Sequence, residues 1–200
     1  MTRSSSTARL RVTACMLLAV IAAVAVSRRD LLAGATGELA ALAGLMLMIG
    51  AALGRIWTSA FIAGFKDETL VTIGPYAACR HPLYAASMLR MLGAGLATRS
   101  LSLTALVCAT FLPLYLHAAR AEDARLARLH GPEFEQYRAR APAFLPQRAV
   151  QPVPAELLIR PWVFRKSFLD AGALIGVYVA IRLADLAQAG GMTPVLLDLP

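Results

Sequence analysis

The residue types best suited to chemistry lie in one stretch, residues 74–84, whose sequence is GPYAACRHPLY. Pro75 and Pro82 each fix φ, remove a backbone donor and push the preceding residue out of helical geometry. The stretch therefore cannot be one continuous helix, although apolar sequence lies on both sides of it. Arg80 and His81 fall at this break, where a basic pair can bind a polar or anionic ligand. The same residue types would equally suit a solvated turn between two helices.

An acidic pair, Glu122 and Asp123, is the second candidate for chemistry. Taken alone, it suits a solvated helix face that pairs with Arg125 at i,i+3 spacing. If it faces a pocket, one member is favoured, because neighbouring residues point about 100° apart around a helix. Glu122 shares a face with Leu126 and Leu129 by i,i+4 and i,i+7 spacing, so Glu122 is expected to face the pocket and both leucines to be buried.

Composition indicates a membrane protein. The chain has 200 residues, which suits a single domain, and 58% of them are hydrophobic, with a mean hydropathy of +0.61. The net charge of +8 comes mostly from arginine, because Lys66 and Lys166 are the only lysines. The arginines sit at the ends of apolar runs, as positive-inside flanks do, rather than among aromatics on a polar surface. Nucleic-acid binding is therefore not expected.

The elements that must position the candidates are five apolar runs, which predict an all-α polytopic membrane protein with about five transmembrane helices. The runs are Leu10 to Val26, Leu39 to Ile62, Tyr84 to Ala97, Leu101 to Ala119 and Phe168 to Ala187. The first run also fits a signal peptide, although it is long for one. Gly44, Gly50 and Gly54 in the second run suit close helix contact, and Pro113 predicts a kink in the fourth.

Polar segments complete the predicted organisation of one membrane domain over residues 1–200. A charged amphipathic helix follows the fourth run and is expected to end near Gly131-Pro132. Residues 147–161 are proline-rich and predict a linker, and the C-terminal helix is expected at about 168–187. Arg90 lies inside the short third run, where an ionisable residue is a functional candidate unless it snorkels or pairs with a carboxylate.

The arginine distribution predicts the orientation. With a cytoplasmic N terminus, five spans place residues 1–9, 64–83 and 119–167 inside, and these segments hold most of the arginines. This satisfies the positive-inside rule and brings the Arg-His stretch and the acidic pair to the same cytoplasmic face. Cys15, Cys79 and Cys108 form no CxxC motif, so neither a disulfide framework nor a metal site is expected.

The polar residues follow one another in an ordered series of motifs. They are Gly74-Pro75-Tyr76, Arg80-His81-Pro82-x-Tyr84, Glu122-Asp123-x-x-Leu126, Gly131-x-x-Phe134-x-x-Tyr137 and Pro142-x-x-Leu145-Pro146. In this order and spacing the chain resembles the isoprenylcysteine carboxyl methyltransferase family, which is related to the phospholipid N-methyltransferases. The resemblance covers about residues 40–147, the family-like core.

The resemblance implies an integral membrane enzyme, expected in a bacterial inner membrane, that uses S-adenosylmethionine in a pocket on the cytoplasmic side. A lipophilic small molecule or prenylated cysteine-like substrate would enter from the lipid bilayer and accept the methyl group on a carboxylate, thiol or amine. Carried over to this chain, the cofactor-binding residues are Tyr76, Arg80, His81, Pro82, Tyr84, Glu122 and Asp123. The candidate catalytic residues are Glu122 and Arg120. The family commonly has an arginine one turn before the acidic pair, where this chain has Ala118, and Arg120 lies about 200° around the helix from Glu122.

Two other functions remain open at this point. One is an NADPH-dependent membrane reductase of the distantly related steroid-reductase type, although the chain shows no second basic motif tied to a glycine turn. The other is a non-catalytic membrane protein that retains the fold. Direct cofactor binding distinguishes all three.

Overall fold

The computed structural model describes residues 27–29, 34–62, 69–146, 155–157, 159, 161–190, 192 and 197–199. Its elements are β1 (Ser27–Arg29), α2 (Ala35–Ile62), α3 (Pro75–Ala78), α4 (Pro82–Ala97), α5 (Leu101–His130), α6 (Pro132–Arg140), α7 (Pro161–Ala189) and β2 (Leu197–Leu199). The predicted helical fold is thus observed, with one addition. β1 and β2 form a short parallel pair, with Ser27 opposite Leu197, that the hydropathy pattern did not predict. The first apolar run, residues 10–26, lies outside the described residues.

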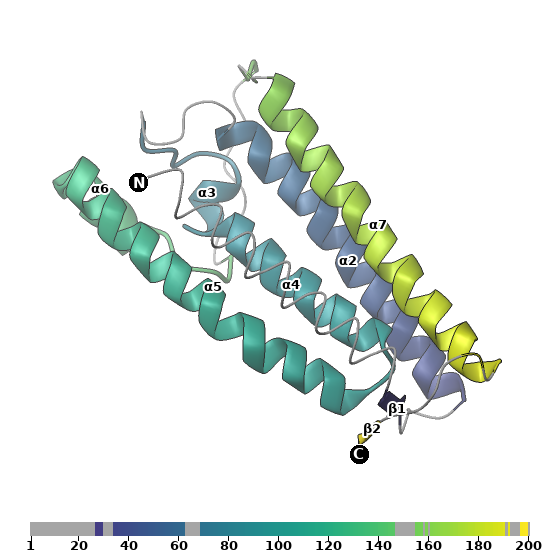
Figure 1. The fold of residues 1–200 in the computed structure, drawn as a ribbon. Coiled ribbons are helices and arrows are strands. Elements are labelled where there is room, and N and C mark those ends of the chain that lie inside the picture. The colour runs from purple at the N-terminus through teal and green to yellow at the C-terminus, as the bar shows by residue number, and fades with distance from the viewer. Residues whose placement is uncertain are drawn as a thin grey trace.

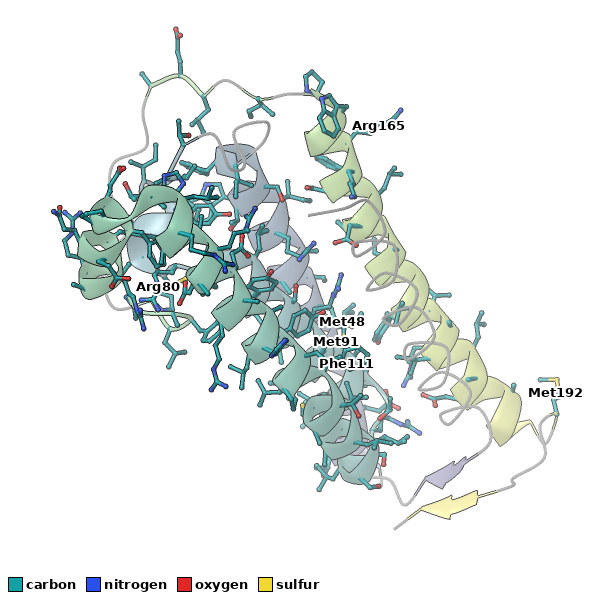
Figure 2. All side chains as sticks on the ribbon, turned by 60° about the vertical axis from the view of Figure 1, so that its left-hand side comes forward. Met48, Arg80, Met91, Phe111, Arg165 and Met192 are labelled. Carbon is teal, nitrogen blue, oxygen red and sulfur yellow. The ribbon has the colours of Figure 1, made fainter. Side chains whose placement is uncertain are left out.

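Four long helices form a bundle in which α4 lies between α5 and α2, and α7 covers the other side of α2 (Figure 1). Met91, Val107 and Phe111 form a buried apolar cluster where α4 meets α5. Figure 2 shows Met48 of α2 at the same level as Met91 and Phe111, with Arg80 at the opposite end from the strands. The bundle interior is therefore apolar at mid-height and polar towards α3 and α6.

Three helices of the described chain are long and apolar enough to cross a membrane: α2, α5 and, within α7, Arg165–Ala187. Five spans were predicted. Of the other two, the first lies outside the described residues. α4 has only 16 residues and is about 24 Å long at 1.5 Å per residue, short of the roughly 30 Å of a hydrocarbon core. Its length suits a helix enclosed by α2 and α5.

Close contact of α2 with α4 depends on Gly44 and Gly93. A Cβ added at Gly44 would lie 2.5 Å from the backbone oxygen of Gly93, so a side chain there would force the helices apart. The prediction of close contact is confirmed at Gly44, whereas at Gly50 and Gly54 an added Cβ meets nothing within 4 Å among the described residues.

The fourth apolar run and the charged helix after it are one element. α5 runs for 30 residues without interruption and carries Pro113 in its interior, so it spans about 45 Å. It ends as predicted, because Gly131 adopts a φ of 51° and Pro132 begins α6. The single long helix places the acidic pair at the polar end of the bundle.

α7 differs from its predicted bounds. It begins at Pro161 rather than near residue 168, and most of the predicted linker, residues 147–154, lies outside the described residues. Ile181 is its one buried hydrophobic residue among those described. Near the C-terminal end of α7, Arg182 lies 3.2 Å from Glu38 of α2, which also pairs with Arg99. Ion pairs therefore contribute to the attachment of α7 to the bundle.

Candidate functional site

The break between α2 and α4 has the geometry that its glycine and prolines impose. Gly74 adopts a φ of 59°, and a Cβ there would lie 2.3 Å from the Phe61 ring. Pro75 begins the single turn of α3, Cys79 is extended, and Pro82 begins α4. The predicted interruption of the helix is confirmed. It leaves Arg80 and His81 in non-helical backbone at the polar end of the bundle.

Backbone pairing fixes this break against the segment that follows α6. The Arg80 N–H donates to the Pro142 carbonyl at 2.8 Å, and the His81 N–H donates to the Ala143 carbonyl at 2.9 Å. The buried Tyr137 hydroxyl donates to the carbonyl of Tyr76 at 2.7 Å. The Gly-to-Tyr motif and the proline segment after it therefore support the stretch containing Arg80 and His81.

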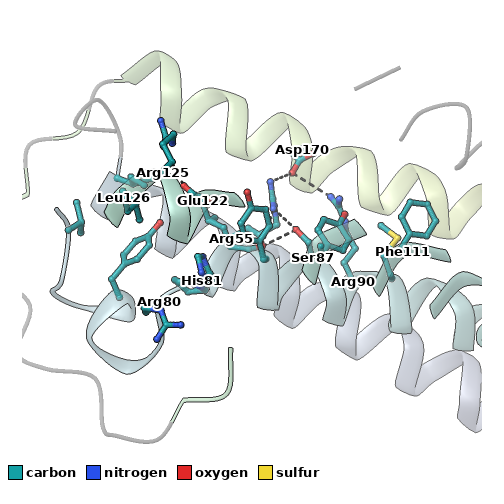
Figure 3. Close-up of a pocket in the computed structure, with 18 of the residues that line it drawn as sticks. Arg55, Arg80, His81, Ser87, Arg90, Phe111, Glu122, Arg125, Leu126 and Asp170 are labelled. Atoms are coloured by element: carbon teal, nitrogen blue, oxygen red, sulfur yellow. Dashed lines mark hydrogen bonds and ion pairs between the residues drawn. The ribbon is translucent and has the colours of Figure 1, made fainter. Parts of the chain in front are cut away.

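A cavity of about 580 Å³ opens beside this stretch, between α2, α3, α4, α5 and α7. This volume is in the range of small-molecule and cofactor sites. Six of the seven residues expected to bind the cofactor line it: Tyr76, Arg80, His81, Pro82, Tyr84 and Glu122. Figure 3 shows Arg80, His81 and Glu122 at one end of the cavity and Phe111 at the other. The cavity thus joins a polar end to an apolar end.

Asp123, the seventh expected residue, lies behind the cavity wall and is not part of its lining. Its two carboxylate oxygens contact different residues: Oδ1 lies 2.8 Å from His81 Nε2, and Oδ2 lies 3.1 Å from Arg80 Nη2. Arg80 Nη1 also donates to the carbonyls of Arg138 at 3.1 Å and Ala141 at 2.6 Å. Asp123 and Arg80 therefore tie α5, α6 and the start of α4 together.

The helix phase inferred from the sequence is half right. Glu122 and Leu126 line the cavity, and Leu126 packs against the buried cluster of Phe134 and Tyr137. Leu129 was expected to be buried and is 54% exposed. The chain turns back at Gly131, so α6 covers the Leu126 side of α5 and leaves Leu129 outside.

Arg120, the second candidate catalytic residue, is exposed on α5 and is absent from the cavity lining. Arg125 lines the cavity instead, with its Nη2 3.8 Å from the Glu122 carboxylate. The sequence pattern suggested Arg125 only as the partner of a solvated acidic pair. Its i,i+3 spacing from Glu122 was the one feature of the sequence that could have placed Arg125 beside Glu122 in the site.

Burial keeps several groups near the break in their neutral form. Burial, with Glu122 nearby, raises the pKa of the Tyr76 phenol above its ordinary value. Burial also raises the pKa of Tyr137 and the pKa of the Cys79 thiol. The Tyr76 hydroxyl has no hydrogen-bond partner within the described part of the chain. It is a neutral donor on the cavity wall, where a ligand can satisfy it.

Further along the cavity lie Arg55 of α2, Ser87 and Arg90 of α4, and Asp170 of α7. The sequence singled out Arg90 as functional or paired with a carboxylate, and the structure places it 3.5 Å from Asp170. The other three were not predicted as site residues. A charge within an apolar run was the signal available at Arg55 and Asp170. Among the described residues, no group of three or more His, Cys, Asp or Glu side chains is arranged to hold a metal ion.

Comparison with known proteins finds one matching family and two similar proteins. The model of the isoprenylcysteine carboxyl methyltransferase (ICMT) family matches residues 37–128. The chain is 32% identical over 157 residues to the nickel-cobalt-cadmium resistance protein NccN of Alcaligenes xylosoxydans xylosoxydans, covering 78% of this chain and 73% of that protein. It is 37% identical over 142 residues to the cobalt-zinc-cadmium resistance protein CzcN of Cupriavidus metallidurans, covering 71% of this chain and 65% of that protein. No solved structure matches the chain.

The family match covers α2, α3, α4 and most of α5, which carry Tyr76, Arg80, His81 and Glu122. The motifs that carry the resemblance in the sequence are therefore the ones that line the polar end of the cavity. This protein belongs to the isoprenylcysteine carboxyl methyltransferase family.

Proposed function

We propose that this protein is an integral membrane methyltransferase that moves a methyl group from S-adenosylmethionine to a lipophilic small molecule. The observation that carries the proposal is the cavity itself. At one end Glu122 and Tyr76, whose hydroxyl has no hydrogen-bond partner among the described residues, share its lining with Arg80 and His81. Met48, Met91 and Phe111 line the other end. A polar cofactor and an apolar acceptor can therefore meet in one space.

The polar residues suit the charges of this cofactor. Its amino-acid part carries an ammonium, which can donate a hydrogen bond to the Glu122 carboxylate. It also carries a carboxylate, which Arg125 and His81 can contact from the same end of the cavity. The Tyr76 hydroxyl offers a further donor. Asp123 is a positioning residue in this proposal, because it holds His81 and Arg80 at 2.8 and 3.1 Å. Arg120 has no part in it, since it is exposed outside the cavity.

When bound, S-adenosylmethionine supplies an electrophilic methyl group on a sulfonium sulfur. The protein then has to orient the acceptor in line with that bond and keep water away, and orientation alone can lower such a barrier by about 7–11 kcal/mol. The buried Cys79 thiol has a raised pKa, so it is not suited to act as a nucleophile. This favours direct transfer to the acceptor.

We further propose that the polar end of the cavity faces the cytoplasm of a bacterial inner membrane, following the arginine distribution. The relatives NccN and CzcN are named for resistance to nickel, cobalt, cadmium and zinc. A role in that response is the physiological setting we propose, with a lipophilic molecule as the methyl acceptor.

Titration calorimetry on the detergent-solubilised protein tests the proposal. S-Adenosylmethionine should bind the wild type, and Glu122→Gln should weaken binding about 10- to 150-fold, the equivalent of about 1.5–3 kcal/mol for a hydrogen bond to a charged group. Glu133→Gln makes the same change at an exposed position on α6 and should leave affinity unchanged. Binding of NADPH in place of S-adenosylmethionine would favour a reductase. Binding of neither would favour a non-catalytic protein and contradict the proposal.

A further inference from the structure

Two tyrosines from different helices line the cavity. Tyr84 is on α4 and Tyr115 is on α5, and their ring centroids lie 6.2 Å apart with the ring planes inclined by 45°. The pair is thus neither stacked nor edge to face, the two arrangements in which aromatic rings satisfy each other best. Tyr84 was expected to bind the cofactor. Tyr115 was not predicted as a site residue, and it has no part in the function proposed above.

The tyrosine pair lies where the polar and apolar parts of the cavity meet. On one side, the Tyr84 ring lies 5.7 Å from the ring of His81, which lines the polar end. On the other side, Tyr115 packs against the buried apolar cluster that includes Phe111. A methyl group that passes from a polar cofactor to an apolar acceptor has to cross this junction. The two rings therefore lie beside the place of transfer.

The helical geometry of α5 supports the same placement. Tyr115 and Glu122 are seven residues apart, which puts them two turns, or about 10 Å, apart on nearly the same face of the helix. Both residues line the cavity. Glu122 is the proposed partner of the cofactor's ammonium group, and a short flexible chain of carbon atoms joins that group to the sulfonium sulfur. Tyr115 can therefore contact the sulfonium while Glu122 holds the ammonium.

Among the described residues that line the cavity, no carboxylate is left for a sulfonium. Glu122 is the proposed partner of the ammonium, and the other carboxylate, Asp170, lies 2.8 Å from Arg55 Nη2 and 3.5 Å from Arg90 Nη1. Figure 3 shows both of these contacts. A sulfonium also has no N–H or O–H group to donate. An aromatic ring suits it, because the ring face attracts a cation within about 6 Å of the centroid.

We propose that Tyr115, together with Tyr84, holds the positively charged methylsulfonium group of the cofactor and so selects the methylated cofactor over its demethylated product. Tyr115 acts through the face of its ring rather than through its hydroxyl. A cation–aromatic contact is strongest where water is excluded, as it is beside the buried apolar cluster. The inference rests on the function proposed above and adds a residue that positions the methyl group for transfer.

The charge on sulfur gives this contact a direction. An electron pair of the acceptor forms a bond to the methyl carbon, the sulfur–carbon bond breaks, and its electron pair stays on sulfur. The positive charge thus passes to the acceptor, and the sulfur becomes a neutral thioether. The attraction to Tyr84 and Tyr115 is then lost, while Glu122 and Arg125 still face the unchanged amino-acid part. The two rings therefore favour exchange of the spent cofactor for a methylated one.

Titration calorimetry in lipid nanodiscs with S-adenosylmethionine and with its demethylated product, S-adenosylhomocysteine, tests the inference. Tyr115→Leu keeps an apolar side chain but has no ring. It should weaken S-adenosylmethionine binding about tenfold and leave S-adenosylhomocysteine binding unchanged. Tyr115→Phe keeps the ring and should bind both ligands as the wild type does. Tyr178→Leu makes the same change on α7, outside the cavity lining, and should change neither affinity.

Fluorinated phenylalanines at position 115 keep the test decisive if Tyr115→Leu does not fold. Each fluorine withdraws electron density from the ring face at nearly constant size, so S-adenosylmethionine affinity should fall with each added fluorine while S-adenosylhomocysteine affinity stays constant. Equal losses of both ligands in Tyr115→Leu, or no trend with fluorination, would overturn the inference and leave the methyltransferase proposal standing. A wild type that binds neither ligand would refute the methyltransferase proposal, and this inference with it.

Discussion

Glu122 and Asp123 are adjacent on α5, yet their carboxylates lie on opposite sides of the cavity wall. Glu122 lines the cavity, whereas Asp123 lies 2.8 Å from His81 Nε2 and 3.1 Å from Arg80 Nη2 behind it. Successive residues of a helix point about 100° apart, so one helix can present one acid to a ligand and the next to the protein. Substitutions at the two positions are therefore expected to have different effects, on methyl transfer at Glu122 and on stability at Asp123.

Asp123→Asn should lower stability, and Glu122→Gln should not. The His81 and Arg80 side chains are only 3% and 11% exposed, and loss of a hydrogen bond to a charged group costs about 1.5–3 kcal/mol. Thermal unfolding of the detergent-solubilised variants measures this. Glu122→Gln should unfold like the wild type while losing methyl transfer to a membrane extract, and Asp123→Asn should retain much of its activity at low temperature. The reverse pattern would mean that Asp123 faces the cofactor.

Arg125→Ala and Arg120→Ala form a matched pair on the same helix. Arg125 lines the cavity and Arg120 is exposed outside it. Arg125→Ala should weaken S-adenosylmethionine binding about tenfold, at the lower end for loss of a hydrogen bond to a charged group. Arg120→Ala should stay within about 0.5 kcal/mol of wild type, as most surface substitutions do. Equal losses in the two variants would indicate a general effect of positive charge.

Gly44→Ala should destabilise the bundle, and Gly50→Ala should not. A Cβ at Gly44 would lie 2.5 Å from the Gly93 oxygen, and overpacking of this kind costs about 1–3 kcal/mol. Among the described residues, nothing lies within 4 Å of a Cβ added at Gly50, so alanine should gain about 0.5–1 kcal/mol from its better helix propensity. Chemical denaturation of both variants in the same detergent gives the comparison. A loss at Gly50 would reveal a partner for that side of α2.

The buried tyrosines should make the protein sensitive to alkali. Burial raises the pKa of Tyr76 and Tyr137 in the folded state, so above the ordinary tyrosine pKa of about 10 only the unfolded chain releases these protons. Cys79, whose pKa burial also raises, should begin to lower stability above the ordinary thiol pKa of about 8.5. Above about pH 10 the fall should steepen, by up to about 1.4 kcal/mol per pH unit for each tyrosine.

Tyr137→Phe should reduce this alkaline slope. At neutral pH it should also lower stability by about 0.5–1.5 kcal/mol, because it removes the hydrogen bond to the Tyr76 carbonyl. Denaturation between pH 8 and 11 measures both effects. Lysine contributes little to the background, since the chain contains only Lys66 and Lys166. An unchanged slope in Tyr137→Phe would mean that this phenol ionises in the folded protein.

Membrane orientation can be tested at the two ends of the bundle. Ile73, beside α3, is 41% exposed, and Leu101, at the start of α5, is 63% exposed. If the cavity's polar end faces the cytoplasm, an impermeant thiol reagent added outside should label Leu101→Cys but reach Ile73→Cys only in inverted vesicles. Labelling of Ile73→Cys from outside would invert the proposed orientation.

Local rules were enough to predict the positions of the breaks. Pro75 and Pro82 begin α3 and α4, and Gly131 separates α5 from α6, because φ restriction acts within one or two residues and needs no partner. Apolar runs likewise indicated α2, α4 and α5. A helix is buried in a membrane or a core when its successive turns are apolar, and that property is set by its own residues. The motif order also indicated the family, and it pointed to most of the residues that line the polar end of the cavity.

Tertiary structure alone decided which side of each element is used. Gly44 contacts α4 while Gly50 does not, and Leu129 stays exposed because α6 packs on the other side of α5. Asp170 meets Arg90 across 80 residues of sequence, and β1 meets β2 from opposite ends of the chain. Such contacts depend on how the helices pack in space. No periodicity within a single helix specifies which residue of a distant helix it will contact.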